Sequence, residues 1–180
     1  WWAQTENKKM WDEVYNKTID HYIQNTIKGQ TEFDLAMVLY QMYKDKYVCS
    51  SIRNNIWWEF HENRWVETDS GNSLRLNISK KMYKLYVTKI SQYMSIFTSL
   101  DSSDPKYKQN STIINKLTEI SEKLRTTTIK NNIMREAKEI FYDKDFINKL
   151  DSKTHLLCFS NGVIDFQEKT FRKGHPEDYI

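Results

Sequence analysis

Glycine, proline and cysteine are scarce in this chain of 180 residues, and each scarcity excludes a class of protein. Four glycines and two prolines are too few for a low-complexity or disordered chain. The two cysteines, Cys49 and Cys158, favour free thiols in a reducing compartment over a disulfide-stapled secreted domain. No apolar run approaches the roughly 18 residues of a transmembrane helix, and residues 1–9 lack the apolar region of a signal peptide. We therefore expect an intracellular protein that does not associate with a membrane.

Motifs that carry catalysis are missing as well. The glycines are spaced too widely for a phosphate-binding loop, no nucleophile elbow occurs, and no pair of Cys or His has the spacing of zinc ligands. Acidic pairs such as Glu119 with Glu122 share a face of a predicted helix, and capping or the helix dipole accounts for acids near a helix start. From these motifs alone, we therefore expect no catalytic residue, no cofactor-binding residue and no metal ligand.

Apolar residues are abundant enough for a folded core. Hydrophobic residues make up 39% and aromatic residues 14%, which suits one domain with or without a small appendage. Apolar positions recur at three- and four-residue steps, which predicts amphipathic helices. Thr31 and Asp34 resemble a capping box, and residues 101–110 are expected to form a polar loop around Pro105. The expected helices cover about residues 4–28, 31–44, 74–99, 113–124 and 129–141, with a short helix ending near 150.

Short runs of aromatic and β-branched residues predict strands in two places. One is a β-hairpin over residues 56–67, and the other is a meander over residues 156–172. Asn161-Gly162 between two apolar runs is a strong hairpin signal, because glycine accepts the positive φ of such a turn. The expected fold class is α+β, mostly helical, with a Trp-rich β-hairpin and a C-terminal β-meander.

Three tryptophans, Trp57, Trp58 and Trp65, lie in the predicted hairpin. Adjacent residues of a strand face opposite sides, so one of the first two faces the core and the other faces outward. We expect Trp57 and Trp65 to be structural. An outward Trp58 either packs under another element or stacks a nucleobase.

Basic residues are unevenly distributed along the chain. The whole chain has 27 Lys and Arg against 24 Asp and Glu, whereas residues 61–120 have nine against six. Lys80 and Lys84 are four apart on a predicted helix and so share a face, which suits the neutralisation of phosphates. A solvated helix face is the alternative. The predicted DNA-contacting lysines are Lys80, Lys81, Lys84, Lys89, Lys106 and Lys108.

Three stretches together resemble a known family. Their order and spacing are similar to the N-terminal domain of the poxvirus D-five family, which precedes a superfamily-3 helicase in primases of large DNA viruses, phages and plasmids. The C-terminal stretch is the most specific part, and the Trp-rich hairpin adds to it. The stretches are Thr31–Ala36 with Leu39-Tyr40, Trp57–Glu67, and Leu156–Phe166 with Phe171-Arg172 and Pro176–Ile180.

The resemblance implies an excised, non-catalytic domain. Residues 31–180 would precede the ATPase domain of a helicase–primase, and residues 1–30 would be a helix or linker from an upstream domain. ATP and Mg²⁺ are then expected only in the absent helicase domain. The implied partners are single-stranded or forked DNA, the protein's own primase and helicase domains, and further copies through the helicase ring. The implied location is the host cytoplasm or a viral replication factory.

The resemblance carries over structural roles for the motif residues. Asn161 and Gly162 are expected to form a turn, and Asp165 and Asp178 to fix turns or cap the next element. The function that follows is support of helicase ring assembly and DNA engagement in genome replication. A pure protein-interaction module that docks replication partners without DNA is the alternative. We do not expect this chain alone to be an enzyme, whereas its parent would be an ATP-dependent DNA helicase with primase.

Overall fold

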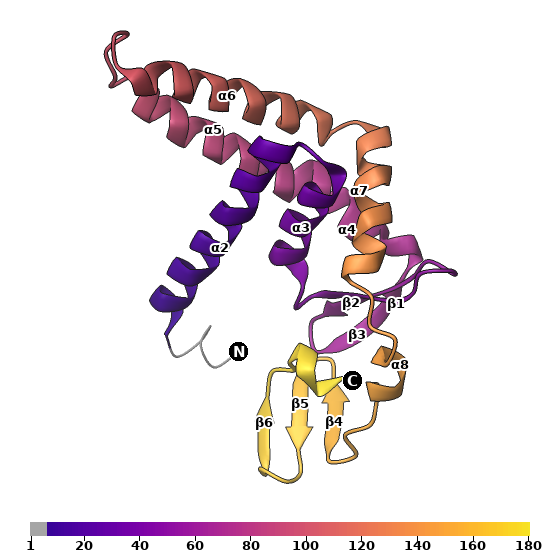
Figure 1. The fold of residues 1–180 in the computed structure, drawn as a ribbon. Helices are drawn as coiled ribbons and strands as arrows, with labels where there is room; N and C mark the ends of the chain where they lie inside the picture. Colours follow the sequence, from indigo (N-terminus) through magenta and orange to yellow (C-terminus); the bar gives the residue numbers. More distant parts are fainter. Residues whose placement is uncertain (1–6) are drawn as a thin grey trace. The chain divides into compact units, whose positions relative to one another are not determined.

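A computed structural model describes residues 7–180 and has the predicted α+β fold (Figure 1). The predicted helix over residues 4–28 is seen from Lys8 to Gly29, and its residues 4–6 lie outside the described part of the chain. The elements in chain order are α2 (Lys8–Gly29), α3 (Glu32–Tyr43), β1 (Tyr47–Ser51), β2 (Ile56–His61), β3 (Arg64–Thr68), α4 (Asn72–Asn77), α5 (Tyr83–Phe97), α6 (Pro105–Lys123), α7 (Thr127–Ile140), α8 (Phe146–Lys149), β4 (Leu156–Phe159), β5 (Gly162–Asp165) and β6 (Thr170–Arg172).

The strands form two antiparallel sheets, in the orders β1-β2-β3 and β4-β5-β6. The Trp-rich hairpin is β2 and β3, and the C-terminal meander is β4 to β6, so both predictions are confirmed. Strand β1 was not expected. It pairs with β2, and it buries Tyr47 and Cys49 on one side of its short alternating pattern.

Two helices start where side chains can bond their first free N–H groups. Thr31 Oγ1 accepts a hydrogen bond from the Asp34 N–H at 3.1 Å, which is one of the two bonds of the predicted capping box. The predicted loop over residues 101–110 is wrong from Pro105 onward, because α6 begins there. The Asp104 carboxylate accepts a hydrogen bond from the Lys106 N–H at 2.8 Å, and proline suits the first position of a helix.

The long helix expected over residues 74–99 is interrupted. Helix α4 is followed by a π-helical turn over Ile78–Met82, and α5 begins at Tyr83. In a π turn the hydrogen bonds span five residues instead of four, so the spacing rules of a regular helix no longer apply across it.

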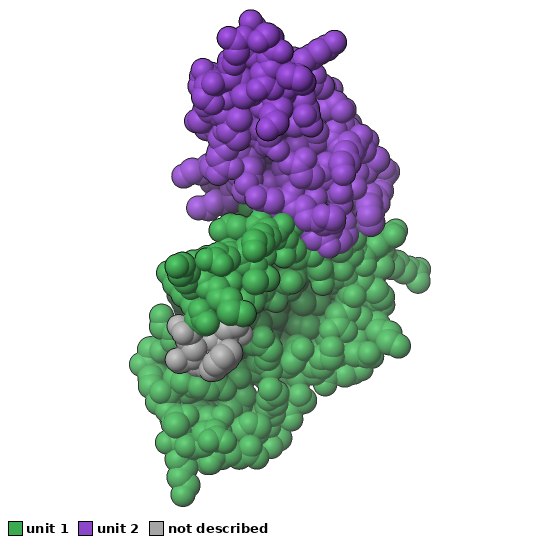
Figure 2. Space-filling model, turned by 60° about the vertical axis from the view of Figure 1, so that its left-hand side comes forward, with its two compact units in different colours: residues 1–18, 40–72, 138–180 green, residues 19–39, 73–137 purple. Residues whose placement is uncertain are grey.

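The chain divides into two compact units, shown in different colours in Figure 2. Unit 1 comprises residues 1–18, 40–72 and 138–180, and unit 2 comprises residues 19–39 and 73–137. Unit 1 contains 14 Lys and Arg against 16 Asp and Glu, a formal −2, whereas unit 2 contains 13 against eight, a formal +5. The domain boundary expected between residues 30 and 31 stays a prediction.

Unit 2 is helical, and its centre is an antiparallel pair formed by α5 and α6 (Figure 1). The Tyr86 hydroxyl is buried and donates to Thr26 Oγ1 at 3.0 Å, while Lys116 Nζ donates to the Ile27 carbonyl at 3.1 Å. Both bonds satisfy polar groups beside the apolar core. That core contains Ile23, Ile27, Leu39, Leu74, Ile78, Met82, Leu117, Leu124 and Ile133.

Unit 1 contains both sheets and the short helix α8. Cys49 of β1 forms a bridge with Tyr142, and the Phe141 ring lies 5.6 Å from Trp57 and 5.0 Å from Tyr40. The segment that follows α7 is therefore held against the first sheet by a backbone bridge and by aromatic contacts. None of the helices in residues 7–180 has the length and apolar character needed to cross a membrane.

Candidate nucleic-acid interface

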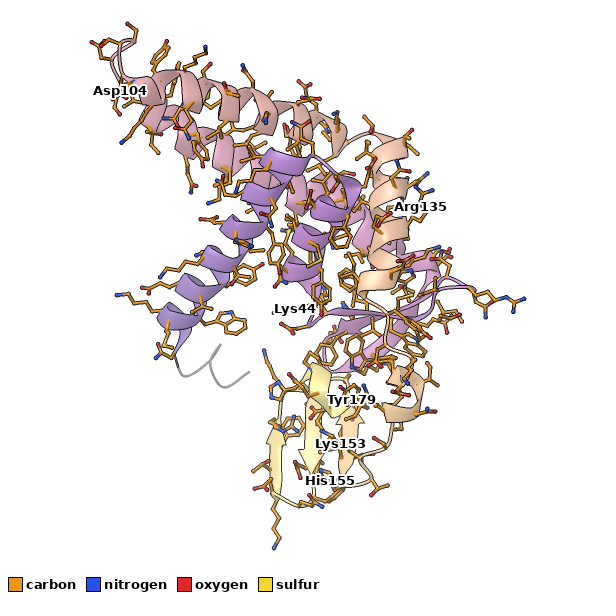
Figure 3. All side chains as sticks on the ribbon, in the orientation of Figure 1. Lys44, Asp104, Arg135, Lys153, His155 and Tyr179 are labelled. Carbon is orange, nitrogen blue, oxygen red and sulfur yellow. The ribbon has the colours of Figure 1, made fainter. Side chains whose placement is uncertain are left out.

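The six predicted lysines do not form one patch. Lys80 and Lys81 lie in the π turn and Lys84 in the first turn of α5, whereas Lys106 and Lys108 lie in the first turns of α6. Because α5 and α6 are antiparallel neighbours, the start of α6 lies beside the end of α5. The two groups are thus about 20 Å apart, the length of a 15-residue helix. Asp104, just before α6, marks the far end of this helical pair in Figure 3.

Lys89 belongs to neither group. Its ammonium nitrogen lies 2.5 Å from Asp20 Oδ1, and its side chain is only 17% exposed. Lys89 therefore pairs with Asp20 within unit 2, and its ammonium group is poorly placed to contact a phosphate. Lys80 and Lys84 no longer share a face by simple spacing, since the π turn separates them from the regular helix.

A contact between helix ends brings two basic segments together. The Arg125 guanidinium carbon lies 5.3 Å from the centre of the Tyr83 ring, which joins the end of α6 to the start of α5. Arg75 Nε donates to Asn131 Oδ1 at 3.0 Å and so joins α4 to α7. We call this region the basic end of unit 2. Its basic residues are Arg75, Lys80, Lys81, Lys84, Lys123, Arg125 and Lys130.

The basic end carries all of the excess charge of unit 2. Residues 75–84 and 119–131 contain seven Lys and Arg against two Asp and Glu, while the rest of the unit contains six against six. Lys80, Lys81 and Lys84 are exposed and form no ion pair within residues 7–180. Lys123 pairs with Glu119 at 2.6 Å, but an exposed pair of this kind contributes little to stability. The sequence missed Arg125 because only the fold brings it beside α5.

The three tryptophans are all engaged within unit 1. Trp57 is fully buried, and its indole N–H donates to Asn55 Oδ1 at 3.0 Å. The Trp58 N–H donates to Ser50 Oγ at 3.0 Å, and the Trp65 N–H donates to the Pro176 carbonyl at 2.8 Å. The base-stacking role considered for Trp58 stays a prediction, and the geometry gives this side chain a packing role.

An aromatic cluster joins the Trp-rich hairpin to the C-terminal segment. The Phe146 ring lies 5.0 Å from Trp65, 5.8 Å from Trp58 and 6.2 Å from Tyr179. The Trp65 backbone N–H also donates to the Ile180 carbonyl. Hairpin and C-terminal residues thus form one packed unit, and contacts between aromatic rings at these separations are favourable. Figure 3 labels Tyr179 in the C-terminal segment.

Asn63 makes a second connection between the hairpin and the C-terminal segment. The sequence predicted only that this residue lies near a turn. It follows Glu62, whose φ of 57° closes the hairpin. Its side-chain amide donates to the Ser160 carbonyl at 3.0 Å, and its Oδ1 accepts from the Gly174 N–H at 2.9 Å. A Cβ on Gly174 would lie 2.5 Å from the Asn63 carbonyl oxygen, so only glycine allows this approach.

Asp165 and Asp178 bond backbone N–H groups. Asp165 Oδ1 accepts from the N–H groups of Gln167 and Glu168, both at 3.0 Å. Asp178 accepts two bonds from the Arg172 guanidinium, at 2.7 and 2.8 Å, and one from the His175 N–H at 2.7 Å. Burial alone would raise the pKa of Asp178, but these hydrogen bonds hold it below its usual value.

The reason proposed for Asn161 and Gly162 is wrong. The turn consists of Ser160 and Asn161, because Phe159 pairs with Gly162, and neither Asn161 nor Gly162 has a positive φ. Gly162 lies instead in β5. A Cβ there would be 2.6 Å from the Arg172 carbonyl oxygen, so glycine is needed for space.

Other features of unit 1 give little sign of chemistry. Burial raises the pKa of the Cys49 thiol and of the Cys158 thiol, so neither is activated as a thiolate. A cavity of about 250 Å³ is lined by aromatic side chains, among them Tyr47 and Tyr179, and by charged residues, among them Lys44 and Asp143. Within residues 7–180 no group of three or more His, Cys, Asp or Glu is placed to hold a metal ion. The expected absence of catalytic, cofactor and metal residues stays a prediction.

Residues 36–180 match the model of the family described as D5 N terminal like. A protein of Acanthamoeba polyphaga mimivirus named as a helicase is 32% identical over 180 residues, which is 100% of this chain and 18% of that protein. A protein of Frog virus 3 (isolate Goorha), also named as a helicase, is 26% identical over 178 residues, covering 83% of this chain and 18% of the relative.

A protein of African swine fever virus named as a primase is 22% identical over 165 residues, which is 85% of this chain and 16% of the relative. The chain therefore spans less than a fifth of the length of each of these three relatives.

Proposed function

Because the chain belongs to the D5 N-terminal-like family, we propose that it is a non-catalytic domain of a replicative helicase–primase of a large DNA virus. Its role is to hold DNA by its phosphates at the basic end and to support assembly of the helicase ring. ATP and Mg²⁺ act in the helicase part of such a protein and not in this chain. The domain works inside the infected cell, where viral DNA is copied.

The distribution of charge is the observation that carries the DNA contact. The formal +5 of unit 2 is confined to residues 75–84 and 119–131, and three of its lysines form no ion pair with an acid in residues 7–180. Lysine and arginine side chains that replace counterions on a phosphate backbone bind without regard to sequence and lose affinity as salt rises. Such binding suits a domain that keeps DNA close to a moving helicase.

The tryptophans of the hairpin and two aspartates of the C-terminal segment support a structural role for unit 1. Burial and hydrogen bonds within the unit favour a structural role for Trp57, Trp65, Asp165 and Asp178. The aromatic cluster holds the hairpin and the C-terminal segment in one arrangement. A rigid unit of this kind can position neighbouring domains, as ring assembly requires.

Fluorescence anisotropy with labelled single-stranded, forked and duplex DNA tests the DNA contact. Changing Lys80, Lys81 and Lys84 together to Glu should remove low-salt binding. The matched control changes Lys28, Lys106 and Lys108 to Glu, an equal change of charge in the balanced part of unit 2, and should keep most of the affinity. Equal losses in both variants would contradict the assignment to the basic end.

An apolar face on the second sheet favours the alternative, a module that docks a protein partner. Leu157, Phe159 and Phe171 lie on β4 and β6 and are each more than 40% exposed. Contiguous exposed apolar patches on a protein surface are typical of interaction sites. Absence of DNA binding at low salt, together with salt-independent binding of the primase or helicase domain, would favour this role. Phe171→Ser should then weaken that binding.

A further inference from the structure

The basic end contains a cation–aromatic pair that differs from its other charges. Arg125 is exposed, and its guanidinium lies over the Tyr83 ring at 5.3 Å, while Tyr83 itself is half-buried at the start of α5. An arginine fork is planar, and an aromatic ring beneath it fixes the orientation of that plane. The lysines nearby have only point charges on flexible stems.

The backbone also restricts Arg125. Helix α6 ends at Lys123, and α7 begins at Thr127, so Arg125 lies in a connection of three residues. Its N–H donates to the Glu122 carbonyl at 3.2 Å, which continues the last turn of α6. The guanidinium is thus held at one place, with Tyr83 on one side and solvent on the other.

Resting on the function proposed above, we propose that Arg125, positioned by Tyr83, is a stacking surface for one base of single-stranded DNA. Lys80, Lys81 and Lys84 contact the phosphates on either side of that base. Bases of single strands stack on guanidinium planes and aromatic rings regardless of sequence. The faces of paired bases are covered by their neighbours in a duplex, so this surface distinguishes single strands from duplexes.

A second aromatic pair in unit 2 lacks these properties. Phe97 and Tyr107 stack on each other at 4.3 Å, at the end of the helical pair opposite the basic end. Asp101 and Asp104 lie beside Lys106 and Lys108 there, so that end has no excess charge. Among the ring contacts in the described residues 7–180, only the pair at Tyr83 combines an accessible planar cation with an excess of nearby lysines.

A pair of ligands with equal phosphate number separates stacking from charge. Binding of the whole chain is measured by anisotropy with labelled oligo-dT and with an abasic sugar–phosphate strand of the same length. The wild-type chain should bind oligo-dT about tenfold more tightly than the abasic strand, since stacking of one base is worth on the order of 1–3 kcal/mol.

Variants then locate the preference. Arg125→Lys retains the charge but not the plane, so it should keep the abasic affinity and lose the tenfold advantage of oligo-dT. Tyr83→Leu should do the same, whereas Tyr83→Phe should keep the advantage. Arg135→Lys on α7 is the matched control and should behave as the wild type. Circular dichroism and the thermal midpoint establish that each variant is folded.

The outcomes distinguish the two proposals. No binding of either strand at low salt overturns the DNA contact itself, and the stacking surface with it. Equal binding of both strands by the wild-type chain overturns the stacking surface alone. A tenfold preference that survives in Arg125→Lys also overturns it, because another residue must then contact the base.

Discussion

Asn63 has more structural consequence than its place in a short turn suggests. One side chain bonds both the Ser160 carbonyl and the Gly174 N–H, so it connects the first hairpin to two separate parts of the C-terminal region. It is 8% exposed, which means that water cannot replace these bonds easily. Polar groups left unpaired in such a place lower stability more than a lost surface bond does.

We therefore expect Asn63→Ala to lower the free energy of unfolding by about 2 kcal/mol, because it leaves a buried donor and a buried acceptor without partners. Urea denaturation followed by tryptophan fluorescence measures the change. Asn54→Ala, in the exposed β1–β2 turn, is the control and should cost less than about 0.5 kcal/mol. Similar urea midpoints for the two variants would contradict the stabilising role given to the Asn63 hydrogen bonds.

The pair formed by Arg172 and Asp178 makes stability depend on acid. The folded pKa of Asp178 is lower than its ordinary value of 3.8, so its contribution is complete above that pH and is lost as pH falls below about 4. Asp178→Asn should reduce stability at neutral pH by about 2 kcal/mol. It should also flatten the acid limb of a plot of unfolding free energy against pH.

The control for this prediction is Asp12→Asn on the exposed face of α2. That change should leave both the neutral stability and the acid limb close to those of the wild-type chain. An unaltered acid limb in Asp178→Asn would mean that other carboxylates dominate the acid response.

At the scale of elements, β5 depends on the absence of a side chain. A Cβ at position 162 would lie 2.6 Å from the Arg172 carbonyl oxygen in β6, and backbone cannot move aside as a flexible side chain can. Gly162→Ala should therefore cost about 1–3 kcal/mol and loosen the pairing of β5 with β6. Thermal unfolding and hydrogen exchange of the β6 amides measure these effects.

Gly29→Ala is the matched control for this substitution. The atom nearest to the added Cβ is Asp34 Oδ2, the end of a side chain that can rotate. Alanine also favours the helix, so the net change should stay within about 1 kcal/mol. A larger loss at position 29 than at position 162 would contradict the role given to space in β5.

Element patterns in the sequence predicted most of the helices and both β regions, since apolar periodicity and turn residues act locally. Three elements were not predicted, and each has an identifiable reason. Strand β1 has two serines and a cysteine, which carry little strand signal. The apolar positions continue at four-residue steps from Leu74 through Ile78 and Met82, so periodicity gave no sign of the π turn. The start of α6 was masked by polar residues around Pro105, although Asp-Pro is itself a helix-start signal.

The candidate site was harder to predict, because it depends on contacts between distant segments. Sequence order placed Lys89, Lys106 and Lys108 with Lys80, yet the fold pairs Lys89 with Asp20 and moves the other two to the opposite end of α6. Arg125 lies 42 positions after Tyr83 and joins it only through the antiparallel arrangement of α5 and α6. No local pattern encodes that contact.

At the scale of the whole molecule, the two units carry opposite formal charges, which bears on the proposed DNA contact. Unit 1 has a formal −2 and unit 2 a formal +5, so the net charges favour the approach of a polyanion to unit 2. With about three phosphates neutralised by Lys80, Lys81 and Lys84, the logarithm of the single-strand affinity should fall with the logarithm of salt at a slope near −2.

Anisotropy titrations at several salt concentrations measure this slope. Single lysine variants, such as Lys84→Ala, should each reduce the slope by about 0.7, the value for one phosphate of a single strand. Lys108→Ala should leave it unchanged. A slope near zero would assign the binding energy to something other than phosphate contact.

The bond between the Trp65 indole and the Pro176 carbonyl spans 111 residues of chain. During synthesis on the ribosome, the first hairpin is complete long before its C-terminal partner exists, and all of residues 73–137 must emerge in between. Contacts so distant in sequence form slowly, because a long loop must close first. We expect nascent chains to expose the Trp65 indole until residues 176–180 have been made, and a chaperone to be needed when synthesis is fast.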